Sequence, residues 1–370
     1  MDIFRSPTFF VSSDRQRGIL QDFHRKDHQL AEAFQKNKPL CFNACAYQKT
    51  HPQKAKEGHR DADATLVAPL LLGVADGVSQ VEEFGMDASL LPRELLKQCE
   101  NLGMVQLIPN SRICPYKGPI PLLKEAFEST QSYGSTTVVM ALLDNGTKIH
   151  GKLHPMIAVI TIGDCELLIL RRIHGRSSPF QAVFHTEMQR IDGHVQTPLQ
   201  LARVDERVDP DFSEDLTIEV IERGSAVHCV SAYEGDVVIL GSDGVFDNLF
   251  LDEVQDIVNQ VLPRGSAVPA AEAVLSQVAK RIVEASHRKS VRLPTGQLPD
   301  APIGRGGKMD DTSVTVGEVV EWTEEHARMY VPPPAALSTW QRRSFLPSFI
   351  PSCTSCCVVS EEDEESCSES

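Results

Sequence analysis

The stretch VVILGSDGVFDN, residues 237–248, decides the fold of this chain. Its first five residues are uncharged and include β-branched side chains, which predicts a short buried strand. The strand leads directly into Asp243, and Gly244 behind it allows a sharp turn and the close approach of another group. A carboxylate in this position is held rigidly yet faces a loop, so it is suited to presenting oxygen ligands to a metal ion.

The same design recurs three times along the chain. Residues 70–75 are apolar and lead into Asp76, and residues 157–163 lead into Asp164. In the last case the order is reversed, because Asp310 precedes the strand-like residues 312–316. One such aspartate is unremarkable, since aspartate favours turns. Four of them predict that one edge of a sheet gathers carboxylates.

Length and composition indicate a globular protein with a large core. The chain has 370 residues, of which 41% are hydrophobic and 24% charged, enough for one large domain or two. Its net charge is −15, and without the acidic last ten residues it is still about −9. Such a surface disfavours nucleic acid and anionic membranes as partners, and it favours divalent cations.

The ten cysteines are expected to be reduced thiols of an intracellular protein. No apolar run reaches the roughly 18 residues of a membrane span, and no secretory signal is recognisable. These features favour the cytoplasm. The N-terminal segment mixes arginines with acids, which transit peptides lack, so a mitochondrial address stays open as the weaker alternative. The residues concerned are Arg5, Arg15, Arg17, Asp2, Asp14 and Asp22.

The order of the expected elements predicts an α+β fold. Strands are expected over residues 41–47, 138–143, 156–162, 166–171, 180–185, 216–221, 237–241 and 312–319. Helices are expected over residues 17–35, 88–102 with Gly103 as the C-cap, 121–131, 251–262 and 270–285. Residues 48–60, 186–215 and 289–309 are expected to be loops. This order suits two antiparallel sheets with helices packed outside them.

Three regions are expected along the chain. Residues 1–38 form a variable N-terminal segment, residues 39–322 form the folded domain, and residues 323–370 form a disordered tail rich in acid, cysteine, serine and proline. Cys353, Cys356 and Cys357 have no partner pair at zinc-site spacing, so they are inert thiols or candidates for acylation. We expect a monomer.

Five motifs in order resemble one family. They are ADGV at residues 75–78, GST at 134–136, IGD at 162–164, SDGVFDN at 242–248 and DDTSV at 310–314. Each is weak alone, but together they resemble the metal-dependent (type 2C) protein serine/threonine phosphatases over residues 40–320. The run GGKMDD at residues 306–311 is similar to the branch whose mitochondrial members carry ADGV early and GGKxDD late.

The resemblance implies a fold, a metal centre and a reaction. The fold would be an α/β/β/α sandwich of two central antiparallel sheets flanked by helices. Asp76 would bridge two Mg²⁺ or Mn²⁺ ions, with the carbonyl of Gly77 on one ion and Asp243 and Asp310 on the other, while Asp63 would order metal-bound water. A metal-bound hydroxide would then hydrolyse phosphoserine and phosphothreonine in phosphoprotein substrates, without a covalent intermediate.

The sequence departs from the family pattern near the first acidic motif. Many members carry two adjacent acids where this chain has Ala62 before Asp63, which puts the second metal in doubt unless Asp61 substitutes. The basic residue that holds the substrate phosphate in family members has no counterpart at the matching position of this chain. Arg60 is the preferred candidate for this role, and His59 is the second choice. Other departures are Val78, Ser79 and Gln80. These departures motivate the alternative of an impaired phosphatase that acts as a phosphoprotein-binding scaffold. A calcium-binding structural module is a more distant alternative.

Several residues have more than one reading. Asp164 is a metal ligand or a structural turn residue. Asp247 and Asn248 are expected to cap the helix that begins near residue 251. Asp311 lies behind the ligands or holds a third ion. The spacing Cys165-x5-Arg171 matches that of cysteine phosphatases, but an apolar strand separates the two residues instead of a glycine-rich phosphate loop, so this reading is rejected.

Overall fold

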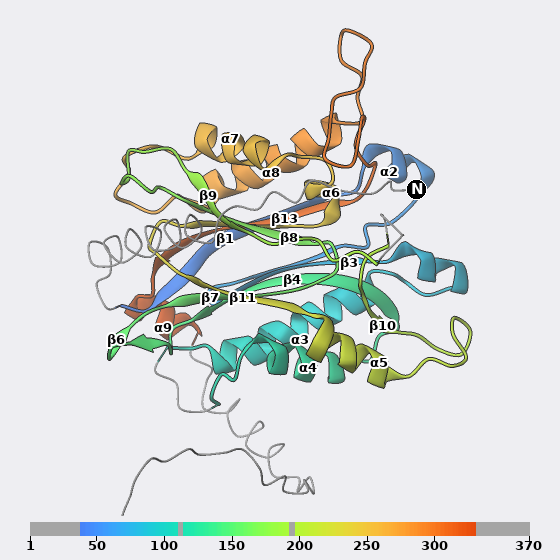
Figure 1. Cartoon of the computed structure of the whole chain (residues 1–370), viewed down its shortest axis with the longest axis horizontal. Helices are drawn as coiled ribbons and strands as arrows, with labels where there is room; N and C mark the ends of the chain where they lie inside the picture. The colour runs from blue at the N-terminus through green and yellow to red at the C-terminus, as the bar shows by residue number, and fades with distance from the viewer. Residues whose placement is uncertain (1–37, 110–113, 192–196, 331–370) are drawn as a thin grey trace, which may run out of the picture. The chain divides into compact units, whose positions relative to one another are not determined.

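The computed structural model describes residues 38–109, 114–191 and 197–330. The helix expected over residues 17–35 and the tail beyond residue 330, with its acidic run and cysteine group, lie outside these residues. In the described part, two antiparallel sheets stack face to face, and helices cover the outer face of each (Figure 1). The expected α+β sandwich is confirmed.

The two sheets draw strands from the whole domain. Sheet A has the order β1-β13-β12-β8-β9, and sheet B has the order β11-β7-β4-β3-β2, with β10 pairing to β4. The strands of sheet A are β1 Leu40–Lys49, β13 Thr312–Glu321, β12 Val237–Gly241, β8 Glu166–Arg171 and β9 Gln181–His185. Those of sheet B are β11 Ala226–Ser231, β7 Met156–Ile162, β4 Gly134–Asp144, β3 Leu71–Gly77, β2 Ala64–Ala68 and β10 Leu201–Arg203. A small hairpin joins β5 Lys148–Ile149 to β6 Lys152–Leu153.

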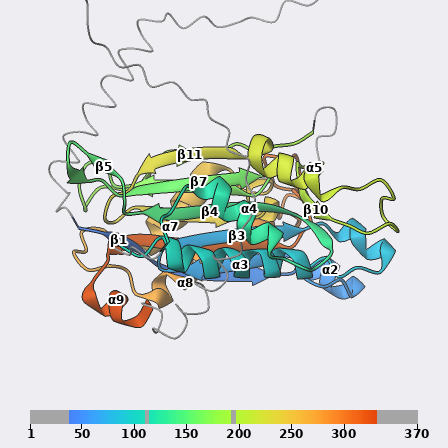
Figure 2. The same ribbon diagram turned by 90° about the horizontal axis from the view of Figure 1, so that it is seen from below.

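Helices lie on the outer face of each sheet. Helices α7 Leu251–Val261 and α8 Glu272–Arg288 cover sheet A. Helices α3 Leu90–Gln106, α4 Pro119–Glu128 and α5 Glu214–Glu219 cover sheet B, and Figure 2 shows α3 and α4 lying against its strands. Shorter helices are α2 Pro52–Glu57, α6 Asp243–Phe246, α9 Glu324–Tyr330, the 3₁₀ turn η1 Ser79–Phe84 and the π turn η2 Val220–Gly224. Every helix in the described ranges is too short or too polar to cross a bilayer.

Neighbouring residues of one strand enter different cores. Ile239 packs with Val258 and Val278 between sheet A and its helices. Leu240, the next residue, packs with Val159 in the core between the two sheets. Side chains alternate along a strand, and here both faces of both sheets are covered. The central strands therefore read as continuous apolar runs, not as alternating patterns.

The prediction of a strand over residues 216–221 is wrong. These residues belong to α5 and η2. The hydroxyl of Ser213 accepts a hydrogen bond from the amide of Asp215, and acids fill the first turn, so helix start signals override the alternating pattern. The strand of this region is β11, which lies at an edge of sheet B. Its residues are only partly buried, which gave no clear apolar signal.

Two further helical features differ from expectation. Residues 52–57 form α2 and not a loop, because Pro52 opens the helix and His51 Nδ1 accepts a hydrogen bond from the amide of Gln53 at 3.2 Å. Helix α3 continues through Gly103 and does not end there. A Cβ atom at this position would lie 2.9 Å from Leu71 Cδ1, so the glycine allows close approach of the helix to β3.

The chain keeps regular structure beyond residue 322. Helix α9 occupies part of the segment expected to lack it. Its start is fixed by Thr323, whose hydroxyl accepts a hydrogen bond from the amide of His326 at 3.4 Å. The imidazole of His326 stacks on buried Trp322, and Ala327 packs against the core between sheet B and its helices.

Truncating one side chain in the core between sheet A and its helices should destabilise the whole domain. Ile239 is fully buried, so Ile239→Ala should lower the free energy of unfolding by about 2–5 kcal/mol, measured by urea denaturation. Val268→Ala is the control, because this side chain is 73% exposed and its loss should change stability by less than about 0.5 kcal/mol. Equal effects of the two changes would contradict this account of the core.

Candidate active site

Strand ends bring the predicted aspartates to one place. The antiparallel pairing of β12 with β13 puts Asp243 and Asp310 at the same end of sheet A. The pairing of β2 with β3 puts Asp63 and Asp76 at one end of sheet B. These two ends meet: besides burial, the charges of Asp63, Asp243 and Asp310 raise the pKa of Asp76. The aspartates were expected at the edge of a single sheet, but they come from the ends of both sheets.

The cluster is buried, which opposes ionisation of its carboxyl groups. Burial, followed by repulsion from Asp61, raises the pKa of Asp63 to about 8. Burial also raises the pKa of Asp243 to about 7 and that of Asp76 well above its usual range. Asp63 and Asp243 are 1% and 4% exposed. Several negative charges in such a place require a cation.

Part of the cluster lacks hydrogen-bond partners. Both carboxylate oxygens of Asp63 are buried, with the hydroxyl of Ser313 and the carboxyl of Asp76 as their side-chain neighbours. Asp243 Oδ1 and Asp311 Oδ1 are buried without a partner in the described part of the chain. A buried polar atom without a partner is costly, so these oxygens point to a ligand that binds oxygen.

Two lysines contact the cluster, one from α2 and one from the segment before β13. Lys308 forms ion pairs with Asp243 and, at 2.6 Å, with Asp310. Lys54 of α2 contacts Asp310 at 2.7 Å and Asp311 at 3.0 Å. Although burial opposes ionisation, the two ammonium groups lower the pKa of Asp310. Sequence reasoning missed both lysines. Only Lys308 carried a signal, since it stands two residues before Asp310.

Asn248 organises the loop around this cluster and caps no helix. Its amide nitrogen donates to the carbonyl of Gly244 at 2.8 Å and to that of Lys308 at 3.0 Å. Its amide oxygen accepts a hydrogen bond from the backbone of Lys308 at 2.7 Å. The N-cap of α7 is Phe250, whose backbone amide donates to Glu253 Oε2 at 2.9 Å. The prediction for Asn248 was wrong because its bonds to Lys308 join it to a residue 60 positions away.

Gly244 allows the backbone at Asp311, just before β13, to approach closely. A Cβ atom on Gly244 would lie 2.1 Å from the carbonyl oxygen of Asp311, so no other residue fits without a backbone shift. The close approach expected from the sequence is therefore made by the backbone of this chain.

Asp247 also serves a different role from the expected cap. Arg190 donates to both carboxylate oxygens of Asp247, at 2.8 and 2.9 Å, and to Asp164 at 3.2 Å. Asp164 lies in the turn that joins β7 of sheet B to β8 of sheet A. Arg190 therefore fixes this turn against the residues that follow Asp243. Sequence reasoning missed Arg190, because the expected loop carried no motif.

The residues around the first acidic motif are less enclosed. Arg60 is exposed, and its described electrostatic partner is Asp87 rather than one of the clustered aspartates. The carboxylate of Asp61 accepts a hydrogen bond from the amide of Asp63 at 3.1 Å, which closes a local turn. Ala62 is buried.

Cys165 is unsuited to nucleophilic chemistry. It is buried, and burial followed by the negative charge of Asp76 raises the pKa of its thiol well above the usual range. Its sulfur lies 3.2 Å from the hydroxyl of Thr137. A thiol in this environment stays protonated, which supports rejection of the cysteine-phosphatase reading.

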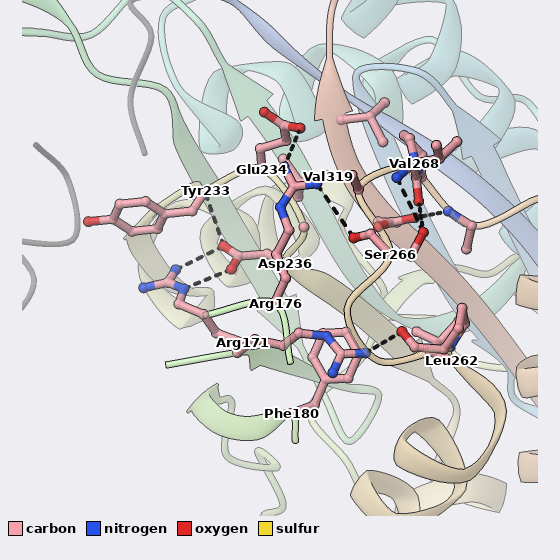
Figure 3. Close-up of a pocket in the computed structure, with 18 of the residues that line it drawn as sticks. Arg171, Arg176, Phe180, Tyr233, Glu234, Asp236, Leu262, Ser266, Val268 and Val319 are labelled. Atoms are coloured by element: carbon pink, nitrogen blue, oxygen red, sulfur yellow. Dashed lines mark hydrogen bonds and ion pairs between the residues drawn. The ribbon is translucent and has the colours of Figure 1, made fainter. Parts of the chain in front are cut away.

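Two cavities lie at different distances from the cluster. One of about 440 Å³ adjoins Arg190 and Asp247, and its walls include His185 and Phe250. Another, of about 210 Å³, lies beyond the start of β12, where Arg171 faces Asp236 in an ion pair of 2.7 Å (Figure 3). Among the described residues, the walls of neither cavity include Asp63, Asp76, Asp243 or Asp310, and the first cavity is bordered by Asp247 in the segment that follows Asp243.

Comparison with known proteins identifies distant relatives. No family model matches the chain. "Probable protein phosphatase 2C 55" of Arabidopsis thaliana is 28% identical over 290 residues, and "Probable protein phosphatase 2C 26" of the same plant is 27% identical over 286 residues. The X-ray structure of the photosystem II phosphatase PBCP matches with a TM-score of 0.52 and 25% identity, over 75% of this chain and 98% of that one. The chain is a distant homologue of the type 2C protein phosphatases.

The extent of the match differs between the two plant relatives. The alignments include 78% and 73% of this chain. They span about half, 54%, of phosphatase 2C 55 and 81% of phosphatase 2C 26. The family resemblance is thereby supported at the level of type 2C phosphatases, and the mitochondrial branch stays a prediction.

The donor set of this type 2C homologue fits hard divalent cations. Asp63, Asp76, Asp243 and Asp310 offer only carboxylate oxygens, which suit Mg²⁺ or Mn²⁺ better than metals that prefer sulfur or nitrogen. The unpartnered Oδ1 of Asp243 adds to this fit. As the described residues stand, no three His, Cys, Asp or Glu side chains are placed so that they could hold a metal ion, and lysines occupy oxygens of Asp243 and Asp310.

Stability should depend on pH through Asp63. Its pKa of about 8 exceeds that of an unfolded aspartate, so between about pH 4 and 8 the folded protein holds the extra proton. Its free energy of unfolding should therefore fall as pH rises through this window when a chelator is present. Asp63→Asn should make this fall shallower, because only the contributions of Asp76 and Asp243 remain, and it should exceed the wild type at pH 8.5 by at least about 1.4 kcal/mol in urea denaturation. Asp205→Asn, outside the cluster, should keep the wild-type slope, and an unchanged slope in Asp63→Asn would refute the assignment.

Removing the Asn248 side chain should weaken metal binding at the candidate active site as well as destabilise the fold. Asn248→Ala removes three hydrogen bonds and should lower the free energy of unfolding by about 2–4 kcal/mol. The matched control is Asn259→Ala, which removes two bonds to the backbone of Phe180, far from the aspartates in the fold. Only the first change should also weaken Mn²⁺ binding in calorimetry. Equal Mn²⁺ affinity in both variants would argue against the role given to Asn248.

Proposed function

We propose that this chain is a protein serine/threonine phosphatase that hydrolyses phosphoserine and phosphothreonine with two Mg²⁺ or Mn²⁺ ions. The observation that carries the proposal is the cluster of Asp63, Asp76, Asp243 and Asp310 at the end where the two sheets meet. Distant homology to type 2C phosphatases supports the same assignment.

Each residue of the cluster has a proposed role. Asp76 would contact both ions, the carbonyl of Gly77 would bind one of them, and Asp243 and Asp310 would hold the other. When bound, the ions would supply a water molecule with a lowered pKa and neutralise charge on the phosphoryl oxygens. Asp63 would orient that water, since its carboxylate is buried beside Asp76. Direct attack by water needs no nucleophile from the protein.

Substrate contacts are proposed for the surface around the cluster. The cavity beside Arg190 and Asp247 is bordered by the segment that follows Asp243, and it is proposed to receive part of a phosphoprotein. Residues 186–215 and 289–309 are proposed to set substrate choice, because loops on a rigid scaffold usually carry recognition. Arg60 is proposed as the cation that holds the substrate phosphate, and its exposure leaves the guanidinium free to reach an incoming ligand.

The proposal also covers the cellular location and the oligomeric state of the protein. We infer a monomer in the cytoplasm, with a mitochondrial location as the weaker alternative. Its partners are phosphoprotein substrates, not nucleic acid, because the chain carries a net charge of −15.

A catalytically impaired, phosphoprotein-binding scaffold is the second candidate. Two observations favour it. Ala62 replaces an acid of the family pattern, and lysines already neutralise Asp243 and Asp310. The retained aspartates favour the enzyme.

Hydrolysis of p-nitrophenyl phosphate and of a phosphothreonine peptide tests the proposal. Full-length protein should turn over both with Mn²⁺ or Mg²⁺ and neither with EDTA. Asp243→Ala should lower kcat by about 10²-fold or more, because it removes a proposed ligand of one ion and with it the charge that this ion supplies to the phosphoryl oxygens. Asp205→Asn, an aspartate outside the cluster, should keep wild-type turnover.

Other outcomes would favour the alternatives. Folded wild-type protein that binds a phosphopeptide but shows no turnover in millimolar Mn²⁺ would support the scaffold. Calcium-dependent stability without hydrolysis would support a structural module. Retention of full activity by Asp243→Ala would refute the proposed centre.

A further inference from the structure

Charges alternate along one side of the aspartate cluster. Lys308 lies between Asp243 and Asp310, and it contacts Asp310 Oδ2 at 2.6 Å. Lys54 lies between Asp310 and Asp311, at 2.7 Å from Asp310 Oδ1 and 3.0 Å from Asp311 Oδ2. Both oxygens of Asp310 are thus held by ammonium groups. These contacts are charge-assisted hydrogen bonds, which are stronger than neutral ones.

The other side of the cluster has no such neutralisation. Asp63 and Asp76 form no ion pair with a lysine within residues 38–109, 114–191 and 197–330. The cluster is therefore divided into a half without a lysine contact and a half whose carboxylates already contact ammonium groups.

The backbone directs Lys308 into the cluster. Asn248 binds both the amide and the carbonyl of Lys308, at 2.7 and 3.0 Å. Gly307 before it has a φ of +60°, and a Cβ there would lie 2.0 Å from Asn248 Oδ1, so this tight turn needs glycine. The side chain is 30% exposed. Its flexible four-carbon stem allows the ammonium to leave while the backbone stays fixed.

An ammonium and a divalent cation cannot share these oxygens without strong repulsion. At about 4 Å, even unit charges repel by about 4 kcal/mol near a protein surface, and a divalent ion doubles this. We propose that Lys308 is a tethered cation that competes with one divalent ion for Asp243 and Asp310. This inference rests on the proposed metal centre. An ion entering beside Asp63 and Asp76 displaces nothing, whereas the other ion exchanges with the ammonium of Lys308.

Mn²⁺ titration of the full-length protein, by calorimetry and by electron paramagnetic resonance of the bound ion, tests the exchange. The wild type should bind two ions, the second at least about tenfold more weakly. Lys308→Met should lower the Kd of the weaker ion by about tenfold, which equals about 1.4 kcal/mol. Lys308→Arg keeps the positive charge and should keep the weak second affinity.

A control and a second measurement separate exchange from general damage. Lys124→Met removes an ion pair of similar exposure on α4, with Glu222, and should leave the Mn²⁺ isotherm unchanged. Lys308→Gln replaces the methionine variant if that variant does not fold. In EDTA, the neutral variants should melt at a lower temperature than the wild type, because no ammonium group balances the charge of their aspartates. Addition of Mn²⁺ should raise their melting temperature by more than it raises that of the wild type.

Binding and turnover distinguish the two proposals. A weaker-site Kd that is unchanged or raised in both neutral variants would overturn the exchange, as would the absence of Mn²⁺ binding to the wild type. A protein that shows the tenfold gain yet hydrolyses no phosphopeptide would overturn the phosphatase function alone. A protein that hydrolyses the peptide without any change in Mn²⁺ affinity would overturn the exchange alone.

Discussion

Holding several carboxylates together away from water is the constraint on which this structure depends. Each charge costs free energy to bury, and each makes the next one harder to ionise. The fold meets this constraint by placing the aspartates at the ends of rigid strands, where the backbone cannot relax to separate them. Burial first, and then the charges of neighbouring aspartates, raise the pKa of Asp63 and of Asp243. Lysines relieve the repulsion between these charges on one side, around Asp310.

The parts of the site that sequence reasoning found share a local signature. Asp76 and Asp243 each end an apolar strand and precede a glycine, and this pattern is legible within ten residues. The antiparallel arrangement was predicted from the order of strands and helices along the chain. Local patterns thus indicated that Asp76, Asp243 and Asp310 gather, whereas Asp63 was proposed only from the resemblance to type 2C phosphatases.

The parts that sequence reasoning missed depend on distant partners. Lys54 reaches Asp310 across 256 positions of the chain, and Asn248 holds Lys308 across 60. Nothing near either residue indicates such a contact, and Asn248 beside a coming helix reads most simply as a cap. The strand expected in place of α5 shows the converse, because capping at Ser213 outweighed an alternating pattern. Tertiary context decides such positions.

The distribution of the aspartates over the two sheets has a mechanical consequence. Asp76 belongs to sheet B, whereas Asp243 and Asp310 flank strands of sheet A. Their separation is therefore set by how the sheets are seated on each other, through the apolar layer that contains Leu72, Val159 and Leu240. If one sheet slides by an ångström over the other, the carboxylates move apart by a comparable amount. The packing between the two sheets thus determines the distance between the aspartates of the candidate active site.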